Sequence, residues 1–224
     1  MTSSDLPDKD WIVDDSQWSH KAFMSDRDAD LFETILLRKA PASGVLNVLE
    51  WGSGRSTVYL TNMLLKEVKQ FFWNSLEYDR EYFLSSLEPV FAESAQFSKS
   101  EEDGRIIFAS QNVRIDVFDY GKLSPFLREH ADDRQVPMDD YIGLPARLGG
   151  RFDVVLVDGR KRRRCTLEAK ELLKPGGVVV VHDAYRPYYH CAFETYTAQQ
   201  FIGDILWIGS KEKTDFSDLL EQAG

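Results

Sequence analysis

Residues 45–57 read VLNVLEWGSGRST. The apolar run Val45–Glu50 is typical of a short buried strand, and Ser56–Lys66 carries apolar residues at 60, 63 and 64, the spacing of one helix face. Gly52 and Gly54 lie between the two patterns, and glycine lets a backbone adopt torsions closed to other residues and pass close to a ligand. This stretch therefore predicts a strand, a ligand-binding turn and a helix.

The same alternation of strand and helix patterns continues along the chain. Val178–Val181 is apolar on successive residues, as a parallel strand covered by helices on both faces should be. We therefore predict an α/β fold, a Rossmann-like, doubly wound, mostly parallel sheet in a single domain with a C-terminal antiparallel hairpin. The predicted strands are Val45–Glu50, Phe71–Glu77, either Arg105–Ala109 or Val113–Phe118, Phe152–Asp158 and Val178–Asp183; the helices are Ser56–Lys66, Arg80–Glu88, stopped by Pro89, and Arg162–Leu173; the hairpin joins Tyr196–Ile202 to Ile205–Gly209.

The length of 224 residues suits one domain with an appendage. Ser25 and Asp28 have the spacing of a capping box and predict the start of a helix that ends near Lys39. We therefore predict an N-terminal arm over residues 1–24 and one folded domain over residues 25–224. Residues 135–150, rich in turn formers, are predicted to be a long connection before the fourth strand.

Charge and composition exclude several classes of partner. Asp plus Glu number 37 and Lys plus Arg 27, and the net charge of −10 disfavours binding to nucleic acids or to membrane surfaces. The sequence has no apolar run near 18 residues and does not start with a secretory signal pattern. Cys165 and Cys191 form neither a disulfide framework nor a metal-binding spacing. We expect a cytoplasmic protein.

Carboxylates follow the predicted strands, at the point where each strand ends. Glu50, Glu77, Asp158 and Asp183 occupy such positions, and Asp119 is a further candidate. Because the carboxyl ends of parallel strands meet at one edge of a sheet, where ligands bind, we expect a crevice rimmed with negative charge.

The turn after the first strand favours a cationic ligand. A dinucleotide fingerprint requires a third glycine where Thr57 stands, and Glu50 would oppose a pyrophosphate. S-adenosylmethionine carries an ammonium and a sulfonium, which a carboxylate attracts. Glu77 ends the second strand, and its carboxylate can accept hydrogen bonds from the two hydroxyls of a ribose.

Four segments resemble, in their order and spacing, the successive motifs of class I S-adenosylmethionine-dependent methyltransferases: Val48–Gly54, Ser75–Glu77, Phe152–Asp158 and Leu172–Gly177. The resemblance implies that S-adenosylmethionine is the cofactor, with its methionine portion at the glycine turn, its ribose at Glu77 and its adenine at Asp119 or Tyr120. The cofactor-binding residues implied are Glu50, Trp51, Gly52, Ser53, Gly54, Ser56, Thr57, Glu77, Tyr78, Asp119, Tyr120 and Asp158.

The segment from Val157 to Asp183 further resembles small-molecule O-methyltransferases, which implies a small-molecule acceptor methylated on a hydroxyl oxygen. In the divalent-metal members, an Asp ends the fourth strand and an Asp-Asn or Asp-Asp pair ends the fifth. This chain has Asp158 and Asp183 there, but Ala184 follows and supplies no oxygen ligand. A divalent metal is therefore possible but not favoured, and no metal ligand is predicted.

Asp158, His182 and Asp183 are the predicted catalytic residues. Histidine titrates near neutral pH and can take the proton of a hydroxyl while the methyl group moves. Neighbouring residues of a regular strand point to opposite faces, so only one of His182 and Asp183 should enter the crevice, and Asp183 is preferred slightly.

Five consecutive cations, Arg160 to Arg164, begin the predicted helix that follows Asp158. The helix dipole disfavours positive charge at that end, so these residues are not there to stabilise the helix. They either form a solvated face or include one or two residues, together with Arg186, that bind an anionic group of the acceptor. We also expect one of Tyr185, Tyr188 and Tyr189 to face the acceptor pocket.

Two alternatives stay open. One is a nicotinamide-dependent oxidoreductase, which Thr57 and Glu50 disfavour. The other is a non-catalytic S-adenosylmethionine-binding subunit, which no residue excludes. The oligomeric state cannot be predicted from this sequence.

Overall fold

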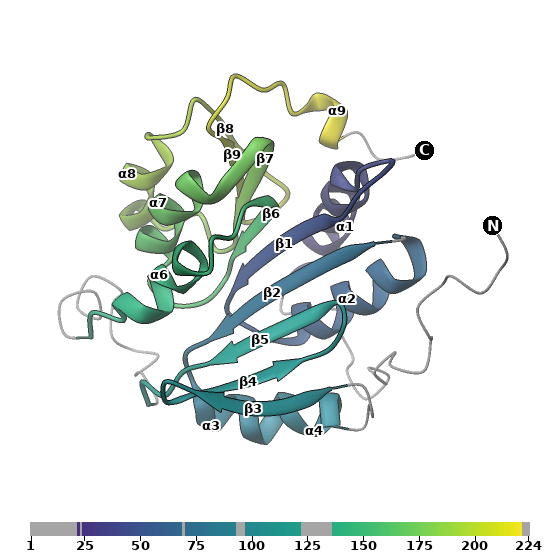
Figure 1. Ribbon diagram of the computed structural model, residues 1–224. Helices are drawn as coiled ribbons and strands as arrows, with labels where there is room; N and C mark the ends of the chain where they lie inside the picture. The colour runs from purple at the N-terminus through teal and green to yellow at the C-terminus, as the bar shows by residue number, and fades with distance from the viewer. Residues whose placement is uncertain (1–21, 23, 69, 93–96, 122–135, 221–224) are drawn as a thin grey trace, which may run out of the picture.

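The computed structural model describes residues 22, 24–68, 70–92, 97–121 and 136–220. They build one nine-stranded sheet in the order β3-β4-β5-β2-β1-β6-β7-β9-β8 (Figure 1). The five central strands are parallel, and the predicted doubly wound α/β fold is confirmed. These strands are β5 (Val113–Val117), β2 (Phe71–Glu77), β1 (Leu46–Trp51), β6 (Phe152–Val157) and β7 (Leu173–Val181).

Antiparallel strands extend the sheet at both edges. At one edge β9 (Leu206–Ser210) pairs with β7 and β8 (Ala198–Ile202) pairs with β9, which confirms the C-terminal hairpin. At the other edge β4 (Arg105–Ala109) pairs antiparallel with β5, so Val113–Phe118 supplies the third central strand. The outermost strand, β3 (Ser98–Glu102), is exposed along its whole length and has no apolar pattern that could have predicted it.

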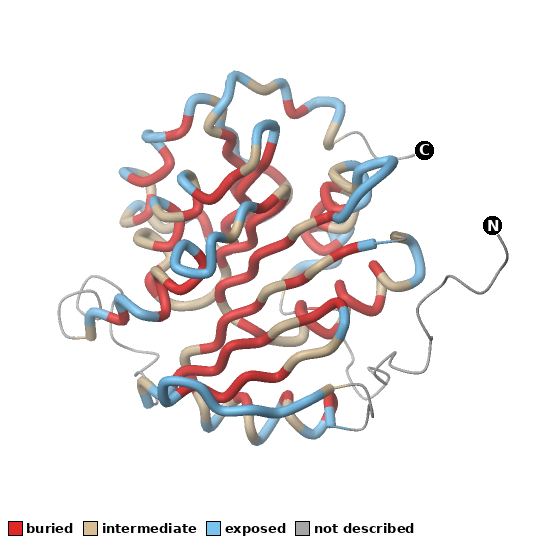
Figure 2. Tube along the Cα trace, viewed as in Figure 1, coloured by how far each residue is buried: buried red, intermediate tan, exposed pale blue. Residues whose placement is uncertain are grey.

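Helices cover both faces of the sheet. Two separate apolar cores result, because strand residues alternate between faces: Val48 of β1 lies in one core and Leu49 in the other. Figure 2 shows the central strands buried along most of their length. The first core contains side chains of α1 (Asp26–Lys39), α2 (Arg55–Glu67), the π-helical turn η2 (Phe83–Leu87) and α4 (Glu88–Ala92), with α9 (Ser217–Leu220) against it. The second contains side chains of α6 (Asp139–Arg147), α7 (Arg162–Leu172), the 3-10 turn η3 (Pro187–Tyr189) and α8 (His190–Phe193).

Two sequence predictions are wrong, one about the end of a helix and one about a segment predicted to contain none. The helix expected to stop at Pro89 runs as α3 (Arg80–Tyr82), η2 and α4 to Ala92. Proline lacks an N–H and clashes with the carbonyl four residues earlier, and the wider π turn just before Pro89 accommodates both defects. Residues 135–150, expected to be a connection, contain α6, whose buried side chains include Tyr141 and Leu144.

The predicted start of the first helix is confirmed. Ser25 Oγ accepts from the Asp28 backbone N–H at 3.2 Å and caps α1. The Asp28 carboxylate does not complete a capping box, because it is buried and accepts from the backbone N–H groups of Asp204 and Ile205, at the β8–β9 turn, at 2.7 and 3.2 Å. The predicted arm over residues 1–24 lies outside the described residues, except for Ala22 and Met24.

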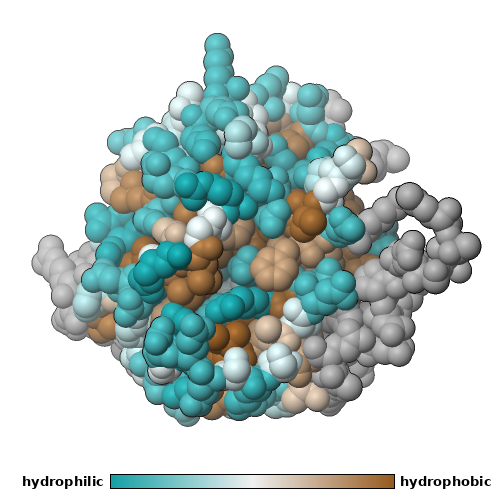
Figure 3. Space-filling view, viewed as in Figure 1, coloured by the Kyte–Doolittle hydropathy of each residue, from teal (hydrophilic) through white to brown (hydrophobic). Residues whose placement is uncertain are grey.

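The second helical layer leaves part of its sheet face open. Beside α6, a hollow of about 410 Å³ is lined by apolar and polar side chains of β1, β2, β5 and α6. Figure 3 shows hydrophobic residues gathered in the middle of this view, ringed by hydrophilic ones. Within the part of the chain that the structure describes, no helix has the length and apolar character needed to cross a membrane.

Candidate active site

A cavity of about 760 Å³ opens at the carboxyl ends of β1, β2, β6 and β7. Strand order reverses between β1 and β6, where a doubly wound sheet forms a crevice. The lining residues come from the four loops that follow these strands: Gly52, Ser53, Gly54, Arg55, Ser56, Glu77, Tyr78, Asp79, Glu81, Tyr82, Ser85, Asp158, Gly159, Arg160, Arg162, His182, Asp183 and Arg186.

Gly52 brings the turn after β1 into backbone contact with the turn after β6. Its φ of +102° is a conformation that side chains rarely allow. A Cβ atom there would lie 2.4 Å from the backbone nitrogen of Gly159. The Trp51 carbonyl accepts from the N–H groups of Asp158 and Gly159 at 2.9 and 2.6 Å, which holds the two turns together.

Glu50 does not line the cavity, and the prediction that its carboxylate extends into the crevice is wrong. Its side chain is fully buried and accepts hydrogen bonds from four donors. Burial raises the pKa of Glu50, and the hydrogen bonds oppose that shift. The carboxylate therefore fixes the glycine turn to β2 from beneath; its donors are Ser56 Oγ (2.7 Å), Thr57 Oγ1 (2.6 Å), Trp73 Nε1 (3.0 Å) and Ser75 Oγ (2.7 Å).

Trp51 and Thr57 are also buried away from the cavity. The Trp51 indole lies in the second core and donates to the Tyr141 carbonyl at 3.1 Å. Thr57 Oγ1 accepts from the Gly54 backbone N–H at 2.9 Å, so it closes the turn. Among the predicted residues of this turn, Gly52, Ser53, Gly54 and Ser56 do line the cavity.

Glu77 lines the cavity at the end of β2. Its Oε1 accepts from the backbone N–H groups of Tyr78 and Asp79 at 3.0 and 2.8 Å. Among the residues that the structure describes, none donates to Oε2. Burial raises the pKa of Glu77 to about 8, so the carboxyl is largely protonated at neutral pH.

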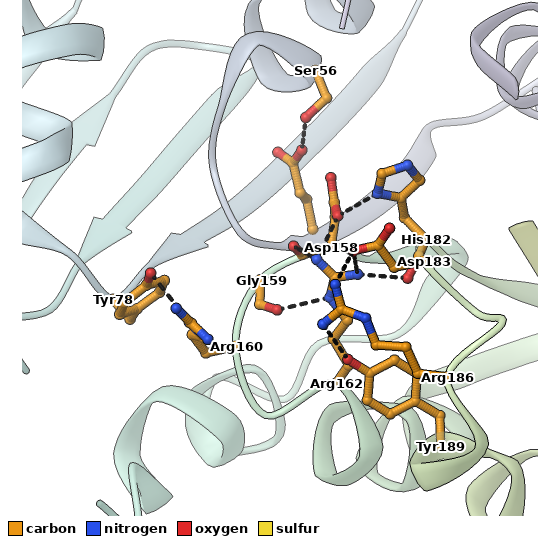
Figure 4. A network of polar contacts seen from close by, with 11 residues as sticks. Ser56, Tyr78, Asp158, Gly159, Arg160, Arg162, His182, Asp183, Arg186 and Tyr189 are labelled. Carbon is orange, nitrogen blue, oxygen red and sulfur yellow. Dashed lines mark hydrogen bonds and ion pairs between the residues drawn. The ribbon is translucent and has the colours of Figure 1, made fainter. Parts of the chain in front are cut away.

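On the opposite side of the cavity, Asp158, Arg162 and His182 form one network (Figure 4). Asp158 Oδ1 lies 2.8 Å from His182 Nδ1 and 3.0 Å from Arg162 Nη2. Arg162 also donates to the backbone carbonyls of Asp158, Gly159 and His182 at 2.9, 3.0 and 2.7 Å. The guanidinium therefore ties the end of β6 to the end of β7.

His182 has one ring nitrogen held by Asp158 and the other buried without a hydrogen-bond partner among the described residues. The buried nitrogen is Nε2, and the side chain is 8% exposed. Burial lowers the pKa of His182, but the hydrogen bond and charge of Asp158 outweigh burial, and the net pKa is raised above 6.5. Asp158 thus favours the tautomer with a proton on Nδ1, which leaves a lone pair on Nε2 when the ring is neutral.

His182 and Asp183 both line the cavity, although a regular strand would admit only one of them. The strand β7 ends at Val181, and Asp183 has a φ of +56°, a left-handed conformation that breaks the alternation. Asp183 Oδ2 accepts from Arg162 Nη1 and from Arg186 Nη2, each at 2.9 Å. Two guanidinium groups therefore share one carboxylate oxygen.

Several solved structures to which this chain is similar are methyltransferases by name. A methyltransferase-like protein from Silicibacter pomeroyi is similar over 84% of this chain and 86% of its own, with 24% identity and a TM-score of 0.57. The O-methyltransferase TomG from Streptomyces achromogenes, solved in complex with S-adenosylmethionine, is similar over 95% of this chain and 92% of its own, with 15% identity and a TM-score of 0.53. The chain has the class I methyltransferase fold.

A third solved structure, cofactor-bound Rv0187 from MTB, is similar over 85% of this chain and 83% of its own, with 16% identity and a TM-score of 0.51. No family model and no curated protein matches the sequence. At identities of 15–24% the likeness is one of fold, and the chemistry depends on the residues at the site.

Within the methyltransferase fold, Asp119 and Tyr120 do not line the main cavity, contrary to their predicted place beside an adenine. They border a separate hollow of about 360 Å³, and Asp119 lies 3.4 Å from Arg80 Nη1. Instead, Tyr78, Asp79, Glu81, Tyr82 and Ser85 line this end of the cavity. Of these, Asp79 could have been found from its position: it lies two residues after Glu77 and caps α3 by accepting from the Tyr82 N–H at 2.9 Å.

The residues at the ends of β6 and β7 do not fit a divalent metal. The two aspartates that would bind it, Asp158 and Asp183, are bridged by the guanidinium of Arg162 at 3.0 and 2.9 Å. In the described ranges, His, Cys, Asp and Glu side chains nowhere gather in a group of three that could hold a metal ion.

The basic run does not form a solvated face. Arg160 lies over the Tyr78 ring and donates to its hydroxyl at 3.4 Å, and Lys161 is buried at the start of α7. Arg163 stacks over Tyr188 at 4.7 Å, and Arg164 binds Asp139 at 2.5 Å. Of the run, Arg160 and Arg162 line the cavity.

None of the three tyrosines expected near the acceptor is a lining residue of the cavity. Tyr189 is buried in the second core, Tyr188 packs against that core, and Tyr185 is exposed. One of them contacts a lining residue: the Tyr189 hydroxyl accepts from Arg186 Nη1 at 3.5 Å.

Proposed function

We propose that the protein transfers a methyl group from S-adenosylmethionine to a hydroxyl oxygen of a small-molecule acceptor. The observation that carries this proposal is His182, a lining residue of the cavity: Nδ1 is held by Asp158, and the buried Nε2 has no partner among the described residues. An imidazole oriented in this way, with no partner on its second nitrogen, can serve as a general base when an acceptor hydroxyl reaches that nitrogen.

The cavity suits S-adenosylmethionine in size and in chemistry. Its volume of about 760 Å³ is that of a small-molecule site. Glu77 Oε2 can accept from the ribose hydroxyls, and the glycine turn lets the chain pass close to the methionine portion. When bound, S-adenosylmethionine supplies a methyl group made electrophilic by its sulfonium.

Strand order supports a division of the cavity into a cofactor end and an acceptor end. Glu77 ends β2 and the glycine turn ends β1, so a cofactor held by both leaves the ends of β6 and β7 for the acceptor. His182 stands on that side, beside Asp158. The main contribution of the protein is to hold the two reactants in line.

In the transfer step, His182 Nε2 takes the proton of the acceptor hydroxyl while the oxygen forms the new bond to the methyl carbon. The carbon–sulfur bond breaks, and its electron pair stays on sulfur, which becomes a thioether. Asp158 accepts the Nδ1 proton in a hydrogen bond and stabilises the imidazolium that forms. The products are S-adenosylhomocysteine, a methyl ether and a proton that His182 returns to water.

The test has a binding arm and a turnover arm. Calorimetry should show S-adenosylhomocysteine binding, and S-adenosylhomocysteine formation should be followed with a panel of phenol and sugar acceptors. With an accepted hydroxyl, His182→Gln should keep cofactor binding and lose about 10²–10⁴-fold in kcat. The matched control is His190→Gln, since His190 Nε2 lies 3.2 Å from the Ala184 carbonyl and His190 is not a lining residue of the cavity.

No heat with S-adenosylhomocysteine at millimolar concentration would overturn the proposal. Heat with a nicotinamide cofactor instead would favour the oxidoreductase alternative. Binding without any turnover across the acceptor panel would favour a non-catalytic subunit. The side chains of Asp158 and Asp183, which border an open cavity, support an enzyme over that last alternative.

A further inference from the structure

Charge is segregated along the cavity. The half formed by the loops after β1 and β2 is lined by the carboxylates Asp79 and Glu81, by one cation, Arg55, and by Glu77, whose carboxyl is largely protonated at neutral pH because its pKa is raised to about 8. The half formed by the loops after β6 and β7 is lined by two carboxylates, three guanidinium groups and an imidazole: Asp158, Asp183, Arg160, Arg162, Arg186 and His182. The two halves therefore favour ligand groups of opposite sign.

Arg162 and Arg186 have different positions in the positive half. Arg162 is 11% exposed and ties together the carbonyls and carboxylates at the ends of β6 and β7. Arg186 is 42% exposed, and Asp183 Oδ2 at 2.9 Å and the Tyr189 hydroxyl at 3.5 Å hold its guanidinium (Figure 4). Arg162 is thus a structural cation, and Arg186 is the outer one, oriented in advance at the cavity.

The helix α7 adds to the positive potential of this half. It begins directly after Lys161, has no side-chain cap, and carries no acidic residue in its first turn. The N-terminus of an eleven-residue helix has a partial positive charge, which anions favour. Arg160 also lines the cavity near this end of the helix, which adds positive charge to the same half.

We infer that the acceptor carries an oxyanion, a carboxylate or a phosphate, in addition to its hydroxyl, and that Arg186 binds this group. The inference rests on the proposed function, because it places the hydroxyl at His182 Nε2 and the oxyanion on the same side of the cavity. Guanidinium groups bind carboxylates and phosphates through paired N–H donors, which suits both kinds of anion.

The test compares small phenols that differ in charge, measured by calorimetry on the full chain saturated with S-adenosylhomocysteine. The probes are 4-hydroxybenzoate, 4-hydroxyphenyl phosphate and the neutral 4-hydroxybenzamide. At least one anion should bind about tenfold or more tightly than the amide, the size expected for a charge-assisted hydrogen bond. The tighter of the two anions tells whether the natural group is a carboxylate or a phosphate.

Two arginine variants locate the effect. In Arg186→Met the ratio of the affinity for the anion to the affinity for 4-hydroxybenzamide should fall to about two or less. The affinity for the amide should stay the same. In Arg164→Met the preference should persist, because Arg164 is on the same helix as Arg162 but binds Asp139 and the Pro137 carbonyl outside the cavity. Equal loss in both variants would mean a long-range effect of net charge and would overturn the inference.

Equal affinity for anion and amide in the unaltered protein, or no measurable binding of either anion, also overturns it. The S-adenosylhomocysteine titration that precedes each run separates this failure from failure of the proposed function. If S-adenosylhomocysteine does not bind, the proposed function fails, and the probes are then compared on the protein alone, where the same arginines line the cavity.

Discussion

Gly52→Ala is the substitution that the site should tolerate least. The new residue would hold a φ of +102°, which costs about 1–3 kcal/mol for a residue other than glycine. Its Cβ would lie 2.4 and 2.5 Å from the Gly159 nitrogen and Cα, which are backbone atoms that cannot rotate away. Separating such packed atoms costs about another 1–3 kcal/mol. We expect a loss of about 2–6 kcal/mol in the free energy of unfolding.

The same turn provides a matched control in Gly54→Ala. Gly54 has an extended φ of −166°, and a Cβ there would meet only the Tyr82 hydroxyl at 3.7 Å and Ser56 Oγ at 3.9 Å. Because Gly54 is the N-cap of α2, the expected cost is about 1 kcal/mol or less. Urea unfolding followed by tryptophan fluorescence measures both variants. Equal destabilisation by the two would refute the reasoning that the Gly52–Gly159 contact sets the turn.

Four further outcomes are expected. Ribose hydroxyls that donate to Glu77 should lower its pKa from about 8, so S-adenosylhomocysteine should bind more tightly as pH rises toward 8 and level off above it; calorimetry should lose this slope in Glu77→Gln. The pKa of His182 is raised above 6.5, so kcat should increase with pH through that raised value as the base loses its proton; a flat profile would contradict a role for His182. Glu50→Gln should cost about 1–3 kcal/mol in urea unfolding. The new amide N–H would face a hydroxyl that donates to a carboxylate oxygen in the unaltered protein, so one donor would lose its acceptor. Asp28→Ala should cost a similar amount, about 1–3 kcal/mol in urea unfolding, because it leaves two part-buried backbone N–H groups without their acceptor.

The central strands could be predicted from sequence because helices cover both of their faces, so each strand is rich in apolar residues. Phe71–Glu77 is bounded as predicted for that reason. The exposed edge strand β3 carries no apolar run. In the described sheet it is held by backbone pairing with β4, which a sequence pattern does not reveal. The helix α6 was not predicted, because it contains Gly143 and Pro145 and both residue types are typical of turns and loops.

The edge at which the site lies could also be predicted, since parallel strands end together. The orientation of each side chain at that edge could not. Glu50 shares a face with Val48, and the hydroxyls of Ser56, Thr57 and Ser75 complete its shell only after the chain has folded. Asp183 lines the cavity because its own backbone is left-handed, with a φ of +56°. Sequence patterns predict that conformation mainly at glycine, so an aspartate there gives no signal of it.

The hydrogen bonds from Asp204 and Ile205 to Asp28 have a consequence for how the protein is made. During synthesis Asp28 emerges 176 residues before Asp204, so its carboxylate stays hydrated until almost the entire described chain exists. The first helix and the last hairpin should therefore lock into place together as a late event on the ribosome. Pulse-labelled amide exchange during refolding should show protection appearing in α1 and in β8–β9 at one common rate.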